Sequence, residues 1–124
     1  MKKFRLTLAA AAVFAAGALV GANTFNAPST VLHVAVVKWK AESTPQQRQA
    51  AMEGIRKMAA DVPGIRNIWL KKIKTQPPDY SAVFAIEFEN KAAFDAYANN
   101  PAHKDWEKIY VPIREESYTQ DLTN

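Results

Sequence analysis

Two apolar segments of the sequence have the alternation typical of β-strands. Residues 31–40 are rich in valine and apolar on both faces for most of their length, which predicts a strand covered on both sides. One face carries Val31, His33, Ala35, Val37 and Trp39. Residues 80–89 alternate more strictly, with Tyr80, Ala82, Phe84, Ile86 and Phe88 on one face. On the opposite face, the small residues Val83 and Ala85 are candidates for the border of a cavity.

Two further strands are predicted at residues 65–73 and 116–122. The first has Trp69 in its middle and is followed by the turn sequence Gln76-Pro77-Pro78-Asp79. The last strand places Tyr118 and Leu122 on the same side. The turn between residues 76 and 79 therefore separates two neighbouring strands of one sheet.

Helical spacing of apolar residues predicts three helices. The first runs from Pro45 to about Asp61, with Thr44 and Gln47 as a capping box and Pro63-Gly64 as its end. The second begins after Asn90. The third begins at Pro101 behind a new cap at Asn100, runs to about Arg114, and presents Trp106, Ile109 and Tyr110 on its apolar side.

The predicted order of elements is β-α-β-β-α-α-β, which indicates an α+β, ferredoxin-like fold. In this fold a four-stranded antiparallel sheet carries its helices on one face. The strands nevertheless have apolar residues on both faces, so a monomer would leave an apolar sheet face in water. We therefore expect a homodimer in which two sheets pack face to face, as in a dimeric α/β barrel.

The N-terminus has the pattern of a secretory signal peptide. Lys2, Lys3 and Arg5 precede an apolar run from Leu6 to Ala22 that ends in Val20-Gly21-Ala22. We interpret residues 1–22 as a signal peptide, residues 23–30 as a linker and residues 31–122 as the folded domain. This predicts a periplasmic or secreted protein. A retained N-terminal membrane anchor, or a buried helix, is the alternative, and only a retained leader would give a membrane partner.

Composition removes several classes of site. Of the 124 residues none is Cys, and the formal charge of +4 falls to +1 once residues 1–22 are removed. The basic character thus belongs largely to the leader, and we expect no nucleic-acid partner. With two histidines and no Gly-rich phosphate loop, we expect no metal site and no cofactor.

One segment near the C-terminus resembles a known family motif. Residues 94–103, Phe94-Asp95-Ala96-Tyr97-Ala98-Asn99-Asn100-Pro101-Ala102-His103, are similar to a Tyr-x-x-x-Pro-x-His signature. Together with residues 33–39, Val62-Pro63-Gly64 and residues 80–89, this segment resembles the stress-responsive dimeric α+β barrel family, also called the stress-response A/B barrel or Dabb domain. The resemblance implies a ferredoxin-like protomer, a tight homodimer, and a cavity between the sheet and the helices.

The resemblance also implies residue roles. One plant member of the family is a polyketide cyclase that works without metal or cofactor, through a His base and a substrate-orienting Tyr. By this resemblance His103 matches the base, Tyr97 the orienting phenol and His33 a further pocket residue. The sequence departs from that cyclase at Asn100 and Ala82, where the enzyme has additional histidines.

The chain itself adds a condition on this pair. On one unbroken helix Tyr97 and His103 would be about 240° apart, so only the break at Asn100-Pro101 brings them together. The helix start disfavours a charged imidazole, which favours His103 as a neutral base. The alternative is a structural His103 that bonds the backbone and packs beside Trp106. His33 has a similar alternative, as a hydrogen-bonded histidine of the core or interface.

Two functions therefore remain open from the sequence. The first is a binding protein that holds a small apolar or aromatic ligand in a pocket lined by His33, Tyr97, His103 and Trp106. The second is a cofactor-free enzyme, cyclase-like or lyase-like, that abstracts a proton next to a carbonyl. A pocket lined by both Tyr97 and His103 would favour the enzyme, whereas a filled core would favour a binding or structural role.

Overall fold

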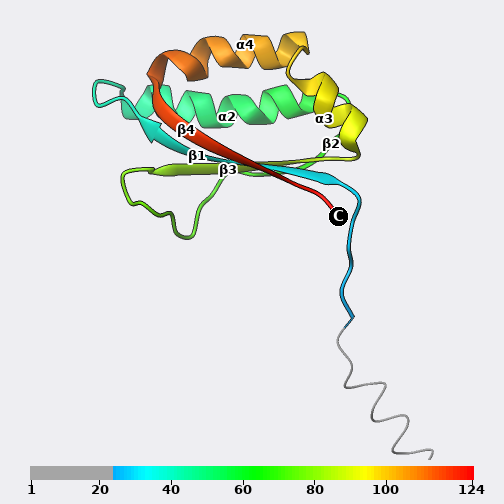
Figure 1. Ribbon diagram of the computed structural model, residues 1–124. Helices are drawn as coiled ribbons and strands as arrows, with labels where there is room; N and C mark the ends of the chain where they lie inside the picture. Colours follow the sequence, from blue (N-terminus) through cyan, green and yellow to red (C-terminus); the bar gives the residue numbers. More distant parts are fainter. Residues whose placement is uncertain (1–23) are drawn as a thin grey trace, which may run out of the picture.

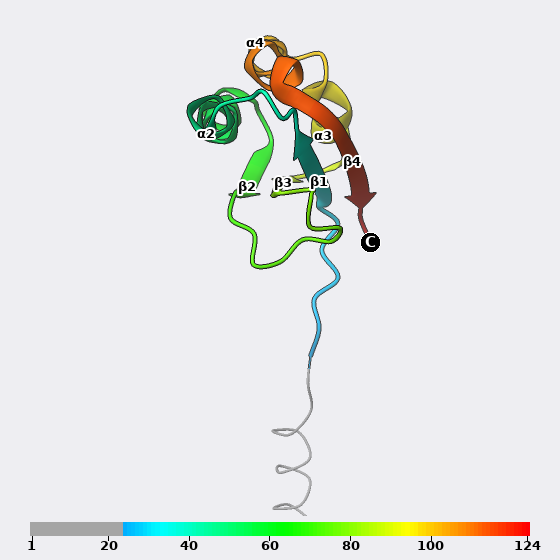
Figure 2. The same ribbon diagram turned by 90° about the vertical axis from the view of Figure 1, so that its left-hand side faces the viewer.

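The computed structural model describes residues 24–124. Four strands form one antiparallel sheet in the order β2-β3-β1-β4, and three helices cover one of its faces (Figures 1 and 2). Helix α2 lies over the β2 side of the sheet, and α3 and α4 lie toward β4 (Figure 2). The predicted ferredoxin-like α+β fold is confirmed. The elements are β1 (Val31–Trp39), α2 (Pro45–Asp61), β2 (Ile65–Trp69), β3 (Ala82–Phe88), α3 (Lys91–Tyr97), α4 (Pro101–Tyr110) and β4 (Arg114–Leu122).

The predicted signal peptide, residues 1–22, lies outside the described residues. Residues 24–30 of the predicted linker form no helix or strand and are almost all exposed. No helix within residues 24–124 is long and apolar enough to cross a bilayer.

Local sequence accounts for the start and end of helix α2. The Thr44 hydroxyl accepts a hydrogen bond from the backbone N–H of Gln47, and the Gln47 side chain accepts one from the backbone N–H of Thr44. This is the predicted capping box. After the helix, Gly64 has a φ of +84°, and a Cβ there would lie 2.5 Å from the Ala93 Cβ. Glycine is therefore required both by the left-handed backbone and by the close approach of α3.

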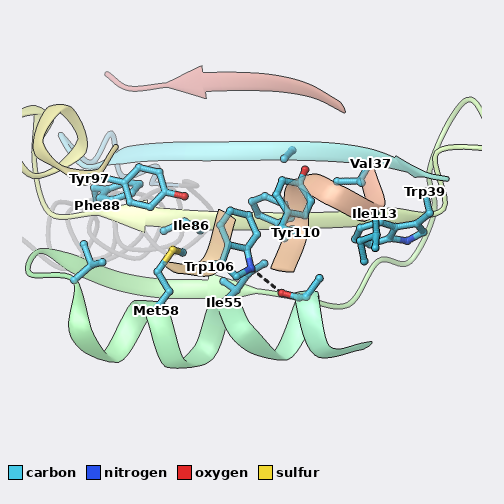
Figure 3. Close-up of a cluster of buried hydrophobic side chains, with 14 of the residues drawn as sticks. Val37, Trp39, Ile55, Met58, Ile86, Phe88, Tyr97, Trp106, Tyr110 and Ile113 are labelled. Carbon is cyan, nitrogen blue, oxygen red and sulfur yellow. Dashed lines mark hydrogen bonds between the residues drawn. The ribbon is translucent and has the colours of Figure 1, made fainter. Parts of the chain in front are cut away.

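The hydrophobic core lies between the helices and the inner sheet face, by which we mean the face that the helices cover (Figure 3). The Trp106 indole donates a hydrogen bond of 2.8 Å to the Ala51 carbonyl, which ties α4 to α2. Its ring stacks on that of Tyr110 at a centroid distance of 4.3 Å. The residues with the least exposure are Val37, Ile55, Met58, Ile86 and Phe88.

Several predicted element boundaries were wrong, including the start of β4, which is Arg114 rather than residue 116. Strand β2 ends at Trp69 rather than at residue 73, because the chain leaves the sheet for a loop that runs to Ser81. Strand β3 begins at Ala82, because the Tyr80 N–H donates to the Pro77 carbonyl in a turn and is lost to the sheet. Helix α4 ends at Tyr110, and residues 111–113 form a 3-10 turn because Pro112 has no N–H to continue the α-helical pattern.

Three predicted side-chain placements also need correction. The turn reverses the alternation at Tyr80, so its ring lies 5.5 Å from that of Tyr118, away from the helices. Val83 and Ala85 pair with Val36 and Val34 on the outer sheet face, so they do not border the cavity that lies under the helices. Ile109 is 46% exposed, although it was expected on the apolar side of its helix.

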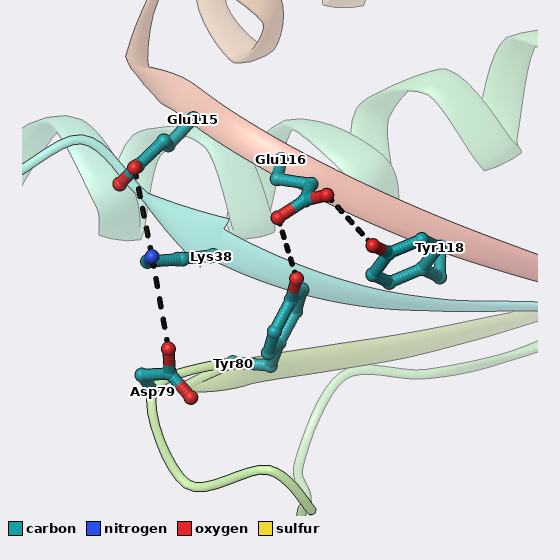
Figure 4. Close-up of polar contacts among 6 residues, drawn as sticks. All are labelled: Lys38, Asp79, Tyr80, Glu115, Glu116 and Tyr118. Atoms are coloured by element: carbon teal, nitrogen blue, oxygen red, sulfur yellow. Dashed lines mark hydrogen bonds and ion pairs between the residues drawn. The ribbon is translucent and has the colours of Figure 1, made fainter.

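A polar cluster lies at one end of the outer sheet face, by which we mean the face opposite the helices (Figure 4). The Glu116 carboxylate accepts hydrogen bonds from the Tyr80 and Tyr118 hydroxyls, at 2.6 and 2.7 Å. These two bonds hold the pKa of Glu116 below its usual value, because they stabilise the ionised carboxylate. Beside them Lys38 lies 3.6 Å from Asp79 and 3.5 Å from Glu115.

Candidate functional site

The largest cavity of the described residues, about 400 Å³, lies between helices α3 and α4 and the β1–β4 half of the inner sheet face. Its floor is formed by β1 and β3, its roof by the two helices, and one wall by β4. The structure brings together on its lining all four residues that the sequence singled out, namely His33, Tyr97, His103 and Trp106.

The break between α3 and α4 sets the position of His103 relative to Tyr97. Helix α3 ends at Tyr97, and the Asn100 side chain caps α4 by accepting a 2.9 Å hydrogen bond from the Ala102 N–H. His103 is consequently the third residue of a new helix, and its ring centroid lies 4.2 Å from that of Tyr97. The change of helix direction overcomes the angular separation that one continuous helix would impose.

The protonation state of His103 follows from its contacts. The residue is 9% exposed, and its Nδ1–H donates to the Ala98 carbonyl at 3.2 Å. Burial lowers the pKa of His103, although the Glu107 carboxylate, 3.6 Å away, acts in the opposite direction. A neutral ring with its hydrogen on Nδ1 leaves Nε2 with the lone pair that can accept a proton.

The structural contacts expected for His103 are also present, since its ring bonds a backbone carbonyl and lies 5.8 Å from Trp106. The two interpretations are compatible. A backbone bond through Nδ1 fixes the ring while leaving Nε2 available, which is how a positioned base is held.

Tyr97 is a neutral hydrogen-bond donor in this site. The side chain is 6% exposed, and burial, aided by the Glu107 charge, raises the pKa of its phenol above the ordinary value. No hydrogen bond within the described residues contributes to this shift in pKa. The Tyr97 hydroxyl oxygen is also not among the fully buried side-chain atoms of residues 24–124 that lack a hydrogen-bond partner. The phenol can therefore donate to an oxygen atom in the cavity.

His33 lies on the floor of the same cavity and has a hydrogen-bond partner of its own. Its Nδ1 donates a 2.6 Å hydrogen bond to the Asp121 carboxylate, its neighbour across the β1–β4 ladder. The ring lies 6.1 Å from the centroids of both Phe94 and Tyr97. Asp121 thus fixes the His33 ring at the edge of the cavity.

The sequence interpretation missed several residues around this cavity. Asp121, Ser117 and Thr119 alternate with Tyr118 and Leu122 on β4, and this alternation was the available indication. Arg114 comes just before a bulge in β4 opposite Lys38 and Trp39, and this bulge shifts the register. Because a bulge has no reliable sequence pattern, its inward position could not be read from spacing.

The described residues contain no group of three or more His, Cys, Asp or Glu side chains arranged to hold a metal ion. The polar groups of the cavity are instead distributed singly among aromatic rings. Such a lining suits an organic ligand with a few hydrogen-bonding atoms.

Residues 31–124 match the sequence model of the stress responsive A/B barrel domain. The chain belongs to this family. No curated protein matches this Dabb chain.

Solved structures with similar folds have low sequence identity to this Dabb chain. A dimeric ferredoxin-like protein of unknown function from Thermobifida fusca is 18% identical with a TM-score of 0.68, and the match covers 82% of this chain and 97% of the other. A Dabb family protein from Mesorhizobium loti is 21% identical with a TM-score of 0.66, covering 77% and 96%. Hydroxynitrile lyase from Passiflora edulis is 15% identical with a TM-score of 0.63, covering 77% and 93%. At these identities the likeness establishes the fold.

Proposed function

We propose that this Dabb domain binds a small, largely apolar ligand in the cavity between its sheet and helices α3 and α4. The observation that carries the proposal is the cavity itself, about 400 Å³ with an aromatic lining and a few convergent polar groups. This volume and this lining fit a planar molecule of one or two rings. Tyr97 and His103 would supply its polar contacts.

A binding experiment with 2-tetralone, a small aromatic ketone, tests this proposal. We expect Ser117→Trp to weaken the affinity at least tenfold, because Ser117 lines the cavity and the indole would occupy it. Gln49→Trp adds the same indole on an exposed position of α2 and should bind as the natural chain does. Isothermal titration calorimetry measures both. Equal affinity for the two variants would refute binding in the cavity.

A second candidate function is proton transfer without a cofactor, and one observation favours it: Tyr97 and His103 line the same cavity with their rings 4.2 Å apart. In this reaction His103 Nε2 takes a proton from the carbon next to a carbonyl. The electron pair of that C–H bond moves into an enolate, and the enolate oxygen accepts a hydrogen bond from the Tyr97 hydroxyl. The protonated ring then returns a proton to carbon. That a lyase shares this fold agrees with such chemistry by analogy only.

We also propose that the domain is a homodimer through the outer sheet face. That face carries apolar side chains from all four strands, and the Thermobifida fusca relative is described as dimeric. Three of the large apolar residues there are half exposed or more, namely Trp69, Tyr118 and Leu122. Covering them with a second sheet would remove an apolar surface of a kind that soluble monomers rarely present.

Export to the periplasm or the medium is the last part of the proposal. It rests on the basic start and the apolar run of residues 1–22. N-terminal sequencing of the protein from the producing cell should give a chain that starts at or near Asn23. A membrane-bound chain that still begins at Met1 would support a retained anchor instead.

A further inference from the structure

Arg114 is placed at one end of the ligand cavity without a carboxylate partner. It is the first residue of β4, is half-buried, and contributes to the cavity lining. Its guanidinium carbon lies 5.1 Å from the ring centroid of Tyr110. None of the ion pairs formed within residues 24–124 includes Arg114.

None of the described carboxylates near Arg114 forms an ion pair with it. Glu115 lies 3.5 Å from Lys38, and Glu116 accepts the two tyrosine hydroxyls on the outer sheet face. Two acidic residues also line the cavity: Asp95 pairs with Lys91 at 2.6 Å, and Glu107 lies 3.6 Å from the neutral His103 ring without forming an ion pair with Arg114. Arg114 is thus the one permanently charged cation among the described residues that line the cavity.

The surroundings of Arg114 suit a planar anion. Trp106 and Tyr110 stack with an interplanar angle of 12°, and the Arg114 guanidinium carbon lies over the Tyr110 ring, so the charged group adjoins two stacked aromatic rings. The Ser117 hydroxyl lines the same wall. A guanidinium held in this way presents a fork of N–H donors that matches the two oxygens of a carboxylate.

The separation of the two ends limits the size of the ligand. Tyr110, under Arg114, follows His103 by seven residues on α4, which is about 10 Å of helical rise. A molecule that reaches both ends is therefore a one- or two-ring aromatic with a short arm.

We propose that Arg114 is the anion-binding end of the cavity and that the ligand is a planar aromatic carboxylate. Its carboxylate pairs with the guanidinium, its rings lie along Trp106 and Tyr110, and its opposite end reaches Tyr97 and His103. This inference rests on the proposed function, because it uses the same cavity, and it adds the charge and the orientation of the ligand.

The test compares 2-naphthoate with its neutral isostere 2-naphthamide by isothermal titration calorimetry. We expect the natural chain to prefer the acid by at least tenfold, since charge-assisted bidentate pairs are stronger than neutral hydrogen bonds. Arg114→Gln should reduce that preference to about one, whereas Arg114→Lys, which keeps the charge but loses the fork, should retain part of it. The control Arg66→Gln removes an exposed arginine of β2 and should keep the full preference.

Each outcome is decisive. If the natural chain binds acid and amide equally, or if Arg114→Gln keeps the preference, the inference is wrong while ligand binding in the cavity stands. If neither probe binds the natural chain, the inference fails together with the proposed function. Thermal unfolding of each variant shows whether the fold is retained, and Arg114→Lys supplies the comparison if Arg114→Gln unfolds.

Discussion

At the scale of single residues, the arrangement of Tyr97 and His103 gives the two side chains different tasks. Burial keeps His103 neutral and Tyr97 protonated, so the first can accept a proton and the second can donate a hydrogen bond. Burial in the same cavity therefore sets both roles, because it lowers the pKa of His103 and raises that of Tyr97.

The first prediction concerns loss of these groups. If the domain catalyses proton transfer, His103→Ala should slow the exchange of the α-protons of 2-tetralone for deuterium by about 10²–10⁴-fold, the usual contribution of a general base. Tyr97→Phe should slow it less and also weaken binding. Proton NMR in D₂O follows the exchange, and circular dichroism checks the fold. His33→Ala serves as the control: since its Nδ1 bonds Asp121, it should lower stability more than rate.

The pH dependence provides a second test at this scale. Because burial lowers the pKa of His103, exchange should fall on acidification with a midpoint below the ordinary value of about 6.5. Glu107 stabilises the protonated ring, so Glu107→Gln should move the midpoint to still lower pH. Unfolded chains bind the proton more readily over this interval, so stability should also fall as the pH decreases through it. A midpoint above 6.5 in the natural chain would contradict the assignment of His103 as a buried neutral base.

At the scale of elements, the break between α3 and α4 is what forms the site. The sequence indicated this break through Asn100 and Pro101, and the same kind of local reasoning gave the capping box of α2 and the turn at Gly64. These features could be predicted because each depends on a few neighbouring residues.

Features that depend on pairing between distant strands were not predictable in this way. The bulge opposite Lys38 and Trp39 turns Arg114 inward, and the turn at Pro77 moves Tyr80 to the outer face. The bond between His33 and Asp121 depends on the register of β1 against β4. The sequence pattern therefore identified the candidate acid–base pair but missed the charged residues around it.

The third prediction tests the role of the helix break. Asn100→Ala removes the cap of α4 and Asn90→Ala removes that of α3, where the side chain accepts a 2.8 Å bond from the Ala93 N–H. Each should lower the free energy of unfolding by about 1 kcal/mol. Only Asn100→Ala should also slow the exchange of 2-tetralone, because only that cap lies next to His103. NMR measures the exchange rates and urea unfolding measures the stabilities. Equal exchange rates in the two variants would show that the cap of α4 does not contribute to proton transfer.

At the scale of the whole molecule, the two sheet faces have different tasks. The inner face holds the core and the cavity, and the outer face is apolar at its centre and polar at the Glu116 end (Figure 4). This division agrees with a dimer that leaves both cavities clear of the interface.

The fourth prediction is that the domain sediments as a dimer at micromolar concentration, with about 2,000 Å² buried in total. Val36→Glu places a carboxylate in the centre of the outer sheet face. It should raise the dissociation constant at least tenfold, because burial of an unpaired charge is strongly unfavourable. Gln49→Glu on α2 adds the same charge outside that face and should leave the dimer intact. A natural chain that sediments as a monomer would exclude the dimer.

The most direct test of ligand binding in the cavity is amide chemical-shift mapping with 2-tetralone. We predict that the shifts on titration are confined to residues around the cavity, with the largest at Tyr97, His103 and Ser117, and that positions remote from it, such as Trp69 on β2, remain unchanged. Shifts centred on the outer sheet face, or no saturable shifts at all, would contradict the account.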